Sequence, residues 1–230
     1  MTTAVYVDGF NLYCGLARPL DCKWVDFQQY FERHFPDDDI RVVYFFEALV
    51  EGPSQARQRE YIRALQTRPK IQVALGKMKR KERRCRVTAC RHAGDRRYLD
   101  YEEKYTDVKI ALTMLDDTHR GLFEKLILVT ADTDLVPAVQ LAKQRRPHQR
   151  IVVRTPALHK RRYAAHDLRV AADHVAVADA ELLLKCQFPR KLLDESGHPI
   201  LRPTAWRQAP LNAVRIWQKQ HSSHRRRRSR

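Results

Sequence analysis

Residues 4–13 read AVYVDGFNLY, an apolar run that ends on a carboxylate. The run is apolar at consecutive positions and does not alternate with polar residues, which is typical of a strand covered on both faces of its sheet. Asp8 closes the run, and Gly9 and Asn11 follow at once. An acid at the end of a buried strand predicts either an ordinary turn or a ligand for a cation.

Five further runs of β-forming residues predict strands at residues 40–48, 71–75, 125–132, 150–155 and 174–179. Helical patterns lie between the runs, at residues 24–35, 54–68, 103–118, 134–146 and 159–172. This alternation predicts a mainly parallel sheet with helices on both faces. Binding sites in such sheets form beyond the carboxyl ends of the strands, so the last residues of each run matter most.

The chain carries a large excess of positive charge. It contains 44 Lys and Arg residues against 27 Asp and Glu residues, a formal net charge of +17 at pH 7. Such an excess attracts polyanions, of which nucleic acid is the commonest, and therefore predicts a nucleic-acid partner. General solubility is the alternative explanation for the charge.

Five cysteines stand at irregular positions, namely Cys14, Cys22, Cys85, Cys90 and Cys186. An odd number without regular spacing predicts reduced thiols and not a disulfide framework. The sequence shows no N-terminal signal segment and no apolar run near the ~18 residues of a membrane span. We therefore expect a cytoplasmic protein with no membrane partner.

Further acids follow the predicted elements. Asp132 and Asp134 lie at and just beyond the end of the run 125–132, at alternate positions whose side chains point the same way in an extended chain. Asp107 lies on the apolar face of the helix predicted at 103–118, and Glu103 lies one turn earlier on that face as a supporting acid. An acid on a core-facing stripe is costly unless something pairs with it.

Three segments thus bring Asp8, Asp107, Asp132 and Asp134 toward one edge of the sheet. Neighbouring carboxylates raise one another's pKa, and a hard divalent cation such as Mg²⁺ or Mn²⁺ removes the conflict. Such ions promote the hydrolysis of phosphodiesters. Taken singly, each motif also fits an ordinary turn, a helix cap or a first-turn acid, so the prediction rests on their joint placement.

The motifs YVDGFNLY, EEKYTDVKIALTML and LVTADTDLVPAV occur in this order over about residues 3–180. Together they resemble the NYN branch of the PIN-like nuclease superfamily, in its bacterial LabA-like group. The resemblance implies a Rossmann-like three-layer α/β/α fold and metal-dependent cleavage of RNA to 5′-phosphate and 3′-hydroxyl products. Two positions depart from the family pattern, because Tyr105 replaces a common glycine and Leu135 a common phenylalanine.

The same resemblance assigns roles to residues of this chain. It implies that Asp8, Asp107, Asp132 and Asp134 bind Mg²⁺. Asn11 would position the attacking water or a phosphate. Thr130 stands where the family often has serine, and would hold the Asp132 loop by hydrogen bonding.

Residues 77–101 form a basic insertion before the predicted helix at 103–118. We expect it to contact RNA through Lys77, Lys79, Arg80, Lys81, Arg83, Arg84 and Arg86. Tyr98 and Tyr101 would stack on unpaired bases or pack against the sheet. Cys85, Cys90 and His92 suggest a structural zinc site, but a fourth ligand is not evident and Cys14, Cys22 or His34 would have to supply it.

The chain divides into an NYN-like nuclease domain at 1–185, an extension at 186–220 and an Arg-rich tail at 221–230 that we expect to be disordered. Part of the extension, FPRKLLDESGHPILRPTAW, also resembles a segment of the same group. The sequence leaves the oligomeric state open, including a homo-oligomer.

The sequence favours a metal-dependent endoribonuclease acting on single-stranded RNA. The alternative is a non-catalytic RNA-binding or regulatory module that retains the fold. A binder gains little from clustered acids where phosphate would lie, so the four carboxylates favour the enzyme. A phosphatase of the haloacid dehalogenase type would need a second aspartate two residues after Asp8, where Phe10 stands.

Overall fold

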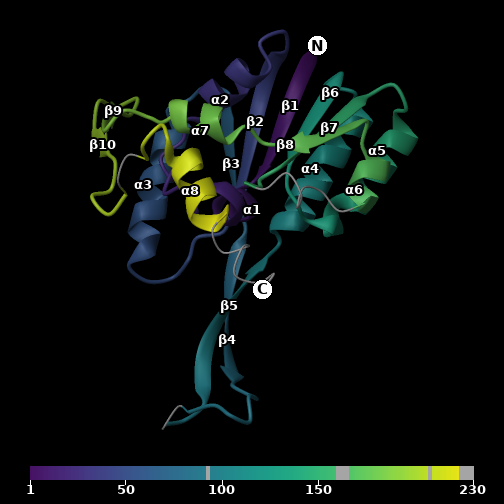
Figure 1. Ribbon diagram of the computed structural model, residues 1–230. Helices are drawn as coiled ribbons and strands as arrows, with labels where there is room; N and C mark the ends of the chain where they lie inside the picture. Colours follow the sequence, from purple (N-terminus) through teal and green to yellow (C-terminus); the bar gives the residue numbers. More distant parts are fainter. Residues whose placement is uncertain (92–93, 159–165, 207–208, 223–230) are drawn as a thin grey trace.

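The computed structural model describes residues 1–91, 94–158, 166–206 and 209–222. Its centre is a six-stranded sheet with the order β3-β2-β1-β6-β7-β8, in which every neighbouring pair is parallel (Figure 1). The strands are β1 (Thr2–Asp8), β2 (Asp39–Glu47), β3 (Ile71–Leu75), β6 (Lys125–Val129), β7 (Arg150–Thr155) and β8 (His174–Val177). The predicted parallel sheet is confirmed, although the run at 125–132 ends as a strand at Val129.

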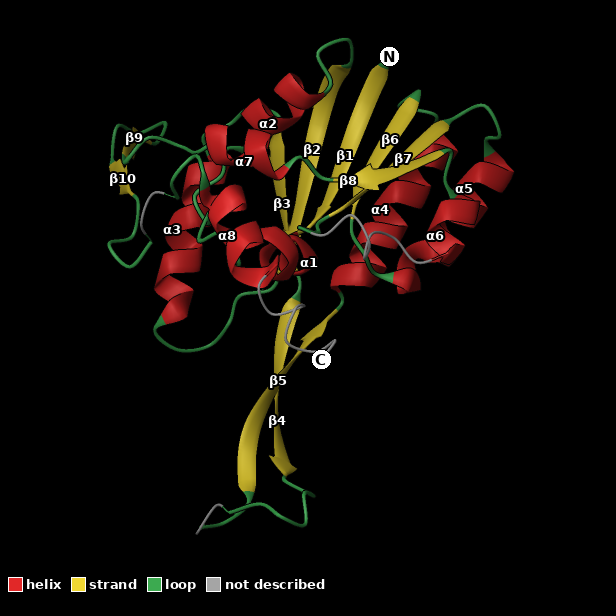
Figure 2. Ribbon diagram, viewed as in Figure 1, coloured by secondary structure: helices red, strands yellow, loops and turns green. Residues whose placement is uncertain are grey.

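Helices cover both faces of the sheet, which confirms the three-layer α/β/α fold (Figure 2). One face carries α1 (Gly9–Leu12), the π-helical turn η1 (Tyr13–Ala17), α2 (Phe27–His34), α3 (Ser54–Gln66), α7 (Ala180–Lys185) and α8 (Ala213–Ser222). The other carries α4 (Thr106–Arg120), the 3-10 turn η2 (Thr133–Leu135), α5 (Val136–Arg145) and α6 (His166–Ala171). The predicted helix at 159–172 begins within the described residues at His166, and residues 159–165 lie outside them.

Strand β1 supplies side chains to both hydrophobic cores. Val5 and Val7 pack into the core under α1, α2 and α3, whereas Ala4 and Tyr6 pack into the core under α4 and α5. Each of these four residues is fully buried. The consecutive apolar positions of the opening run are therefore explained by a strand at the middle of the sheet.

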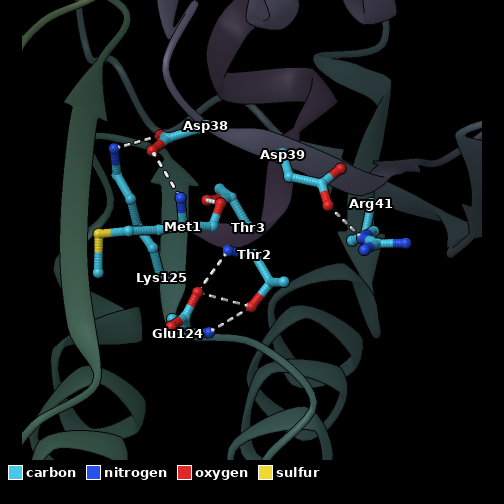
Figure 3. Close-up of polar contacts among 8 residues, drawn as sticks. All are labelled: Met1, Thr2, Thr3, Asp38, Asp39, Arg41, Glu124 and Lys125. Carbon is cyan, nitrogen blue, oxygen red and sulfur yellow. Dashed lines mark hydrogen bonds and ion pairs between the residues drawn. The ribbon is translucent and has the colours of Figure 1, made fainter.

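Polar contacts fix the beginning of β1 between its two neighbours (Figure 3). The Thr2 N–H donates to Glu124 Oε2 at 2.7 Å, and the Glu124 N–H donates to Thr2 Oγ1 at 3.2 Å. Asp38, just before β2, forms an ion pair with Lys125, the first residue of β6. These contacts hold the register of three strands and so determine where Asp8 emerges at the opposite edge.

The strand order reverses at β1. The chain builds β1, β2 and β3 toward one side and then returns to place β6 on the other side of β1. The carboxyl ends of β1 and β6 therefore form a topological switch point, where α/β proteins bind ligands. Val7 pairs with Val129, so Asp8 and Thr130 leave the sheet together.

The basic insertion is an antiparallel hairpin that projects away from the domain (Figures 1 and 2). It consists of β4 (Lys77–Arg84) and β5 (Arg97–Lys104). The helix predicted at 103–118 is wrong at its start, because β5 continues to Lys104 and α4 begins at Thr106. Tyr105 turns the chain between them with a φ of 75°, in the left-handed region. Glycine adopts a positive φ at less cost than tyrosine does, so Tyr105 holds a strained backbone conformation here.

The described part of the C-terminal extension packs against α3 and the loop before α2. It contains a small hairpin of β9 (Lys191–Leu193) and β10 (Pro199–Leu201), followed by α8. The Trp206 ring lies 6.2 Å from that of Trp24 and 5.9 Å from that of Tyr61, and Ile200 is fully buried. The extension therefore shares the core of the domain. Across the described ranges, none of the helices has the length and apolar character needed to cross a membrane.

Candidate active site

Asp8 is buried at the switch point and holds two hydrogen bonds. Its Oδ1 accepts from the Asn11 N–H at 2.9 Å, which caps α1, and its Oδ2 accepts from the Thr130 hydroxyl at 2.9 Å. Burial raises the pKa of Asp8 to about 6, although both hydrogen bonds act in the opposite direction. The charges of Asp107 and Glu103 raise this pKa further. The ionised form of Asp8 is therefore disfavoured by its burial and by the neighbouring acids.

Thr130 and Asn11 connect Asp8 to the loop after β6. The buried Thr130 hydroxyl accepts from the Asp132 N–H at 3.0 Å while it donates to Asp8. The Asn11 side-chain oxygen accepts from the Ala131 N–H at 3.2 Å. The ends of β1 and β6 are therefore tied by side-chain hydrogen bonds, and the Asn11 side chain helps to position the loop.

Asp132 and Asp134 lie on a turn and not on an extended chain, because β6 ends at Val129. The half-buried Asp132 caps η2, since its Oδ1 accepts from the Asp134 N–H at 3.0 Å. Asp134 is exposed within that turn. The prediction that Asp132 and Asp134 lie on an extended strand with side chains pointing the same way is therefore wrong.

Asp107 approaches from the first turn of α4, where it is half-buried. Burial raises its pKa, and the charges of Asp132 and Asp134 raise it further. Glu103 belongs to β5 and not to the helix, which corrects its predicted place. Burial and the charge of Asp107 raise the pKa of Glu103. The Thr106 hydroxyl donates a hydrogen bond to the Glu103 carboxylate, and this bond lowers the pKa.

One acid of this cluster, Glu47, was not predicted from the sequence. It is the last residue of β2, one position beyond Phe46, the pairing partner of Asp8. Burial raises the pKa of Glu47 to about 8, with further contributions from Glu103 and Asp8. The available signal was an acid at the end of a second buried strand, the same feature that identified Asp8.

The donor set fits a hard divalent cation in its chemistry. Carboxylates that raise one another's pKa are relieved when a cation lies among them. Among the described residues, however, no three or more His, Cys, Asp and Glu side chains are close enough together to hold a metal ion. Asp8 and the Asp132 loop are tied by hydrogen bonds, and binding of one ion by all four aspartates would require their side chains to come closer together.

The cations of the hairpin fall into two groups. Lys81 forms an ion pair with Glu102, and Arg83 with Asp100 at 2.5 Å, across the two strands. No ion pair is found within the described part of the chain for the other five predicted RNA contacts, namely Lys77, Lys79, Arg80, Arg84 and Arg86. Tyr98 and Tyr101 are 51% and 43% exposed, so they do not pack against the central sheet.

The cysteines of the hairpin end do not form a metal site in the described residues. Backbone hydrogen bonding from Val87 and a hydrogen bond with Cys90 lower the pKa of the Cys85 thiol. His92 lies outside the described residues. Cys22, one suggested fourth ligand, is fully buried in the domain core. Structural zinc therefore remains a prediction without support.

A cavity of about 340 Å³ adjoins the acidic cluster. Its lining includes Gly9 and Phe10 after Asp8, Glu47 at the end of β2, and Trp206 from the C-terminal extension. The cavity therefore lies between the switch point and the extension. Its size is within the range of pockets that bind small organic ligands.

Comparison with known proteins agrees with this architecture. The model of the NYN domain matches residues 2–179. A curated relative, 6-hydroxy-3-succinoylpyridine 3-monooxygenase HspA of Pseudomonas putida, is 28% identical and the match covers 91% of this chain and 77% of the relative. A crystal structure of a protein of unknown function from Vibrio parahaemolyticus has a TM-score of 0.50 at 17% identity, covers 77% of this chain and 93% of that chain, and shows a likeness of fold. Since the family match spans most of the sequence, the chain belongs to the NYN domain family, within the PIN-like nuclease superfamily.

Proposed function

We propose that the protein is a metal-dependent endoribonuclease that cleaves single-stranded RNA at the switch point. One observation carries the proposal. The buried Asp8 carboxylate is joined through the Thr130 hydroxyl to the Asp132 loop. The charges of that loop also raise the pKa of Asp107. A fold without use for a cation would gain nothing from acids that raise one another's pKa.

Asp8, Asp107, Asp132 and Asp134 would hold Mg²⁺ or Mn²⁺. When bound, such a cation supplies a nucleophile from water at neutral pH and stabilises negative charge on phosphate oxygens. Asn11 and Thr130 hold the two loops in place, so that the ligands on them keep a fixed separation. In the metal-free protein the pKa of Asp8 is about 6, so protons compete with the cation and metal binding should weaken as the pH decreases through that value.

The hairpin serves the same reaction by holding the RNA backbone. The hairpin cations that have no ion pair in the described part of the chain lie on β4 and just beyond it, along the projecting arm (Figure 1). Phosphate contacts of this kind are independent of sequence and sensitive to salt. An arm that holds RNA beside the acids would orient the strand for cleavage.

A second candidate function comes from the relative named as a monooxygenase of a hydroxypyridine. The observation that favours it is the cavity, whose aromatic lining suits a planar ring. Under this alternative, the protein with O₂ and a nicotinamide or flavin reductant would convert 6-hydroxy-3-succinoylpyridine. Turnover of that compound without any cleavage of RNA would favour the alternative over the nuclease.

The proposal is tested by incubating the protein and its Asp132→Asn variant with end-labelled single-stranded RNA in Mg²⁺, Mn²⁺ or EDTA. We expect cleavage by the parent protein with either metal and at least a hundredfold loss in the variant or in EDTA. Equal cleavage by both forms, or cleavage in EDTA, would contradict the proposal. Binding of RNA without cleavage under any condition would indicate the non-catalytic module.

A further inference from the structure

We propose that the cavity beside the acidic cluster binds the base of the nucleotide next to the phosphate that is cleaved. The inference rests on the proposed cleavage of RNA and gives the site a pocket for an unpaired base. Three features of the cavity carry it: its junction with the acids, its aromatic lining and its few free polar groups.

The cavity joins the acidic cluster through Gly9. A Cβ atom at Gly9 would lie 2.6 Å from the Phe46 carbonyl oxygen and 3.0 Å from both Glu47 Oε2 and the Phe45 ring. The absence of a side chain therefore lets the chain that follows Asp8 lie directly on the end of β2. A ligand in the cavity would be next to the residue that follows the buried catalytic acid.

Aromatic rings form much of the lining, from Phe10, Tyr13, Phe27, Phe45, Tyr61 and Trp206. Phe45 and Tyr61 meet edge to face, with ring centroids 6.1 Å apart, and Tyr61 and Trp206 do so at 5.9 Å. These contacts hold the inner rings in place before a ligand arrives. Phe10 and Tyr13 are 45% and 38% exposed, so aromatic surface is available to solvent. Bases stack on aromatic side chains of this kind without strong dependence on sequence.

The polar groups of the cavity suit a base and a phosphate. Gln58 is engaged, because its amide bonds to the Ala48 carbonyl and the Val50 N–H. Lys23 is paired with Asp21. Glu47, whose Oε1 accepts from the Ala48 N–H at 3.2 Å, and Arg57 each keep further hydrogen-bonding groups for a ligand.

Those two groups differ in what they recognise. Glu47 presents a carboxyl group to the cavity, and such a group forms hydrogen bonds with the polar edge of a ring. The Arg57 guanidinium bonds to the Ser54 hydroxyl and keeps other N–H groups for a phosphate. A flat ring with an attached anion therefore matches the cavity better than an aliphatic ligand does.

Continuity with the hairpin favours a base of RNA over a free metabolite. Met78, the second residue of β4, also lines the cavity. The cavity is thus bordered by the acids on one side and, on another, by the end of the hairpin that joins the domain. A strand held along the arm would arrive with its base at the cavity and its phosphate at the acids.

The first experiment measures binding in EDTA, so that it does not depend on cleavage. Isothermal titration compares adenosine and uridine 5′-monophosphates with ribose 5-phosphate. We expect the nucleotides to bind about tenfold more tightly than the sugar phosphate, and Trp206→Leu to remove most of this difference. The control Trp217→Leu, in α8 and outside the cavity lining, should change nucleotide affinity less than twofold. Arg57→Ala should weaken nucleotide binding, whereas its control Arg59→Ala should not.

Thermal melting checks that each variant folds, and Phe10→Ala, at an exposed position of the lining, replaces Trp206→Leu if that variant does not. Equal binding of nucleotide and ribose phosphate would overturn the proposal. So would nucleotide affinity that is unchanged in Trp206→Leu or, if that variant does not fold, in Phe10→Ala. Binding of nicotinate in place of nucleotides would assign the cavity to a free heteroaromatic acid and would also overturn it.

The second experiment uses RNA with a single abasic residue moved along the strand. An abasic residue beside the cleaved bond should raise KM about tenfold, whereas the same lesion four nucleotides away should not. If the parent protein cleaves but no position of the lesion matters, the cavity proposal fails while the nuclease stands. If nothing is cleaved while nucleotides still bind as described, the nuclease proposal fails and the base site stands.

Discussion

Replacing Asp8 with asparagine should make the metal-free protein more stable while it abolishes metal-dependent cleavage. The pKa of Asp8 is about 6 in the fold against 3.8 for a free side chain, a difference of about 2.2 units. At about 1.36 kcal/mol per unit, ionising Asp8 at high pH costs the fold about 3 kcal/mol. Asparagine keeps one accepting oxygen and loses one of the two hydrogen bonds, which costs about 1 kcal/mol. The net gain should be about 2 kcal/mol at pH 8.

The sign of the effect depends on pH. An acid whose pKa is raised by folding stabilises the protein fully below pH 3.8, and this contribution is lost as the pH rises through about 6. The parent protein should lose this stabilisation as the pH rises, whereas Asp8→Asn has no carboxyl group to ionise and should not lose it. The advantage of the variant should therefore grow from about 0.5 kcal/mol at pH 5 to about 2 kcal/mol at pH 8.

Urea denaturation in EDTA at pH 5, 6, 7 and 8 measures this difference. The matched control is Asp116→Asn, an exposed acid of α4 that pairs with Arg120 at 3.3 Å. It should lose about 0.3 kcal/mol with no growth toward high pH. Adding Mn²⁺ should stabilise the parent protein and remove the advantage of Asp8→Asn. A variant that is less stable than the parent at pH 8, or a difference that does not change with pH, would show that ionised Asp8 does not destabilise the fold.

Three further substitutions test separate parts of the structure. Thr130→Val should lower the free energy of unfolding by about 2 kcal/mol in urea melts and reduce cleavage, because the hydrogen bonds to both acidic loops are lost. Thr130→Ser keeps the hydroxyl and should retain both stability and cleavage. Tyr105→Gly should raise the free energy of unfolding by about 0.5–1 kcal/mol, since the residue is 60% exposed and has a positive φ; a loss of stability would contradict this. Lys79→Ala should reduce the salt dependence of RNA binding by about one unit of slope, whereas Lys81→Ala, whose cation is paired with Glu102, should change it less; equal effects would show that the pairing is irrelevant.

The sequence was sufficient for the sheet because its signals are local. The consecutive apolar residues around Val5 and Val7 require a strand buried on both faces, and the alternation with helices requires parallel neighbours. Asp8 was identifiable for the same reason, since an acid that ends such a strand must lie at the edge where sites form. The helical pattern predicted at 103–118 placed Asp107 correctly near the start of a helix.

The errors arose where local signals conflicted with the path of the chain. Glu103 fits the helical pattern of α4, but the antiparallel hairpin extends β5 to Lys104, and the left-handed turn at Tyr105 separates the two elements. The alternation of Asp132 and Asp134 suggested a strand, but the Asp132 side chain caps a 3-10 turn instead. Pairing between strands decides such boundaries, and a single sequence does not show it.

The cavity was beyond the reach of sequence reasoning because its lining comes from distant segments. Gly9, Tyr61 and Trp206 lie far apart in the chain and meet only in the folded protein. Glu47 was recognisable as the end of a strand, but its role depends on knowing that β2 is the neighbour of β1. Long-range placement of this kind follows from topology and not from periodicity.

We propose that the acids on the two sides of the switch point bind a metal ion that promotes the cleavage of RNA. The most direct measurement compares the rates at which Asp107→Asn and Asp116→Asn cleave single-stranded RNA in Mn²⁺. Both are the same substitution in α4, but the charges of Asp132 and Asp134 raise the pKa of Asp107, whereas Asp116 is exposed. We predict a loss of at least a hundredfold for Asp107→Asn and less than twofold for Asp116→Asn. Equal rates for the two variants would contradict the account.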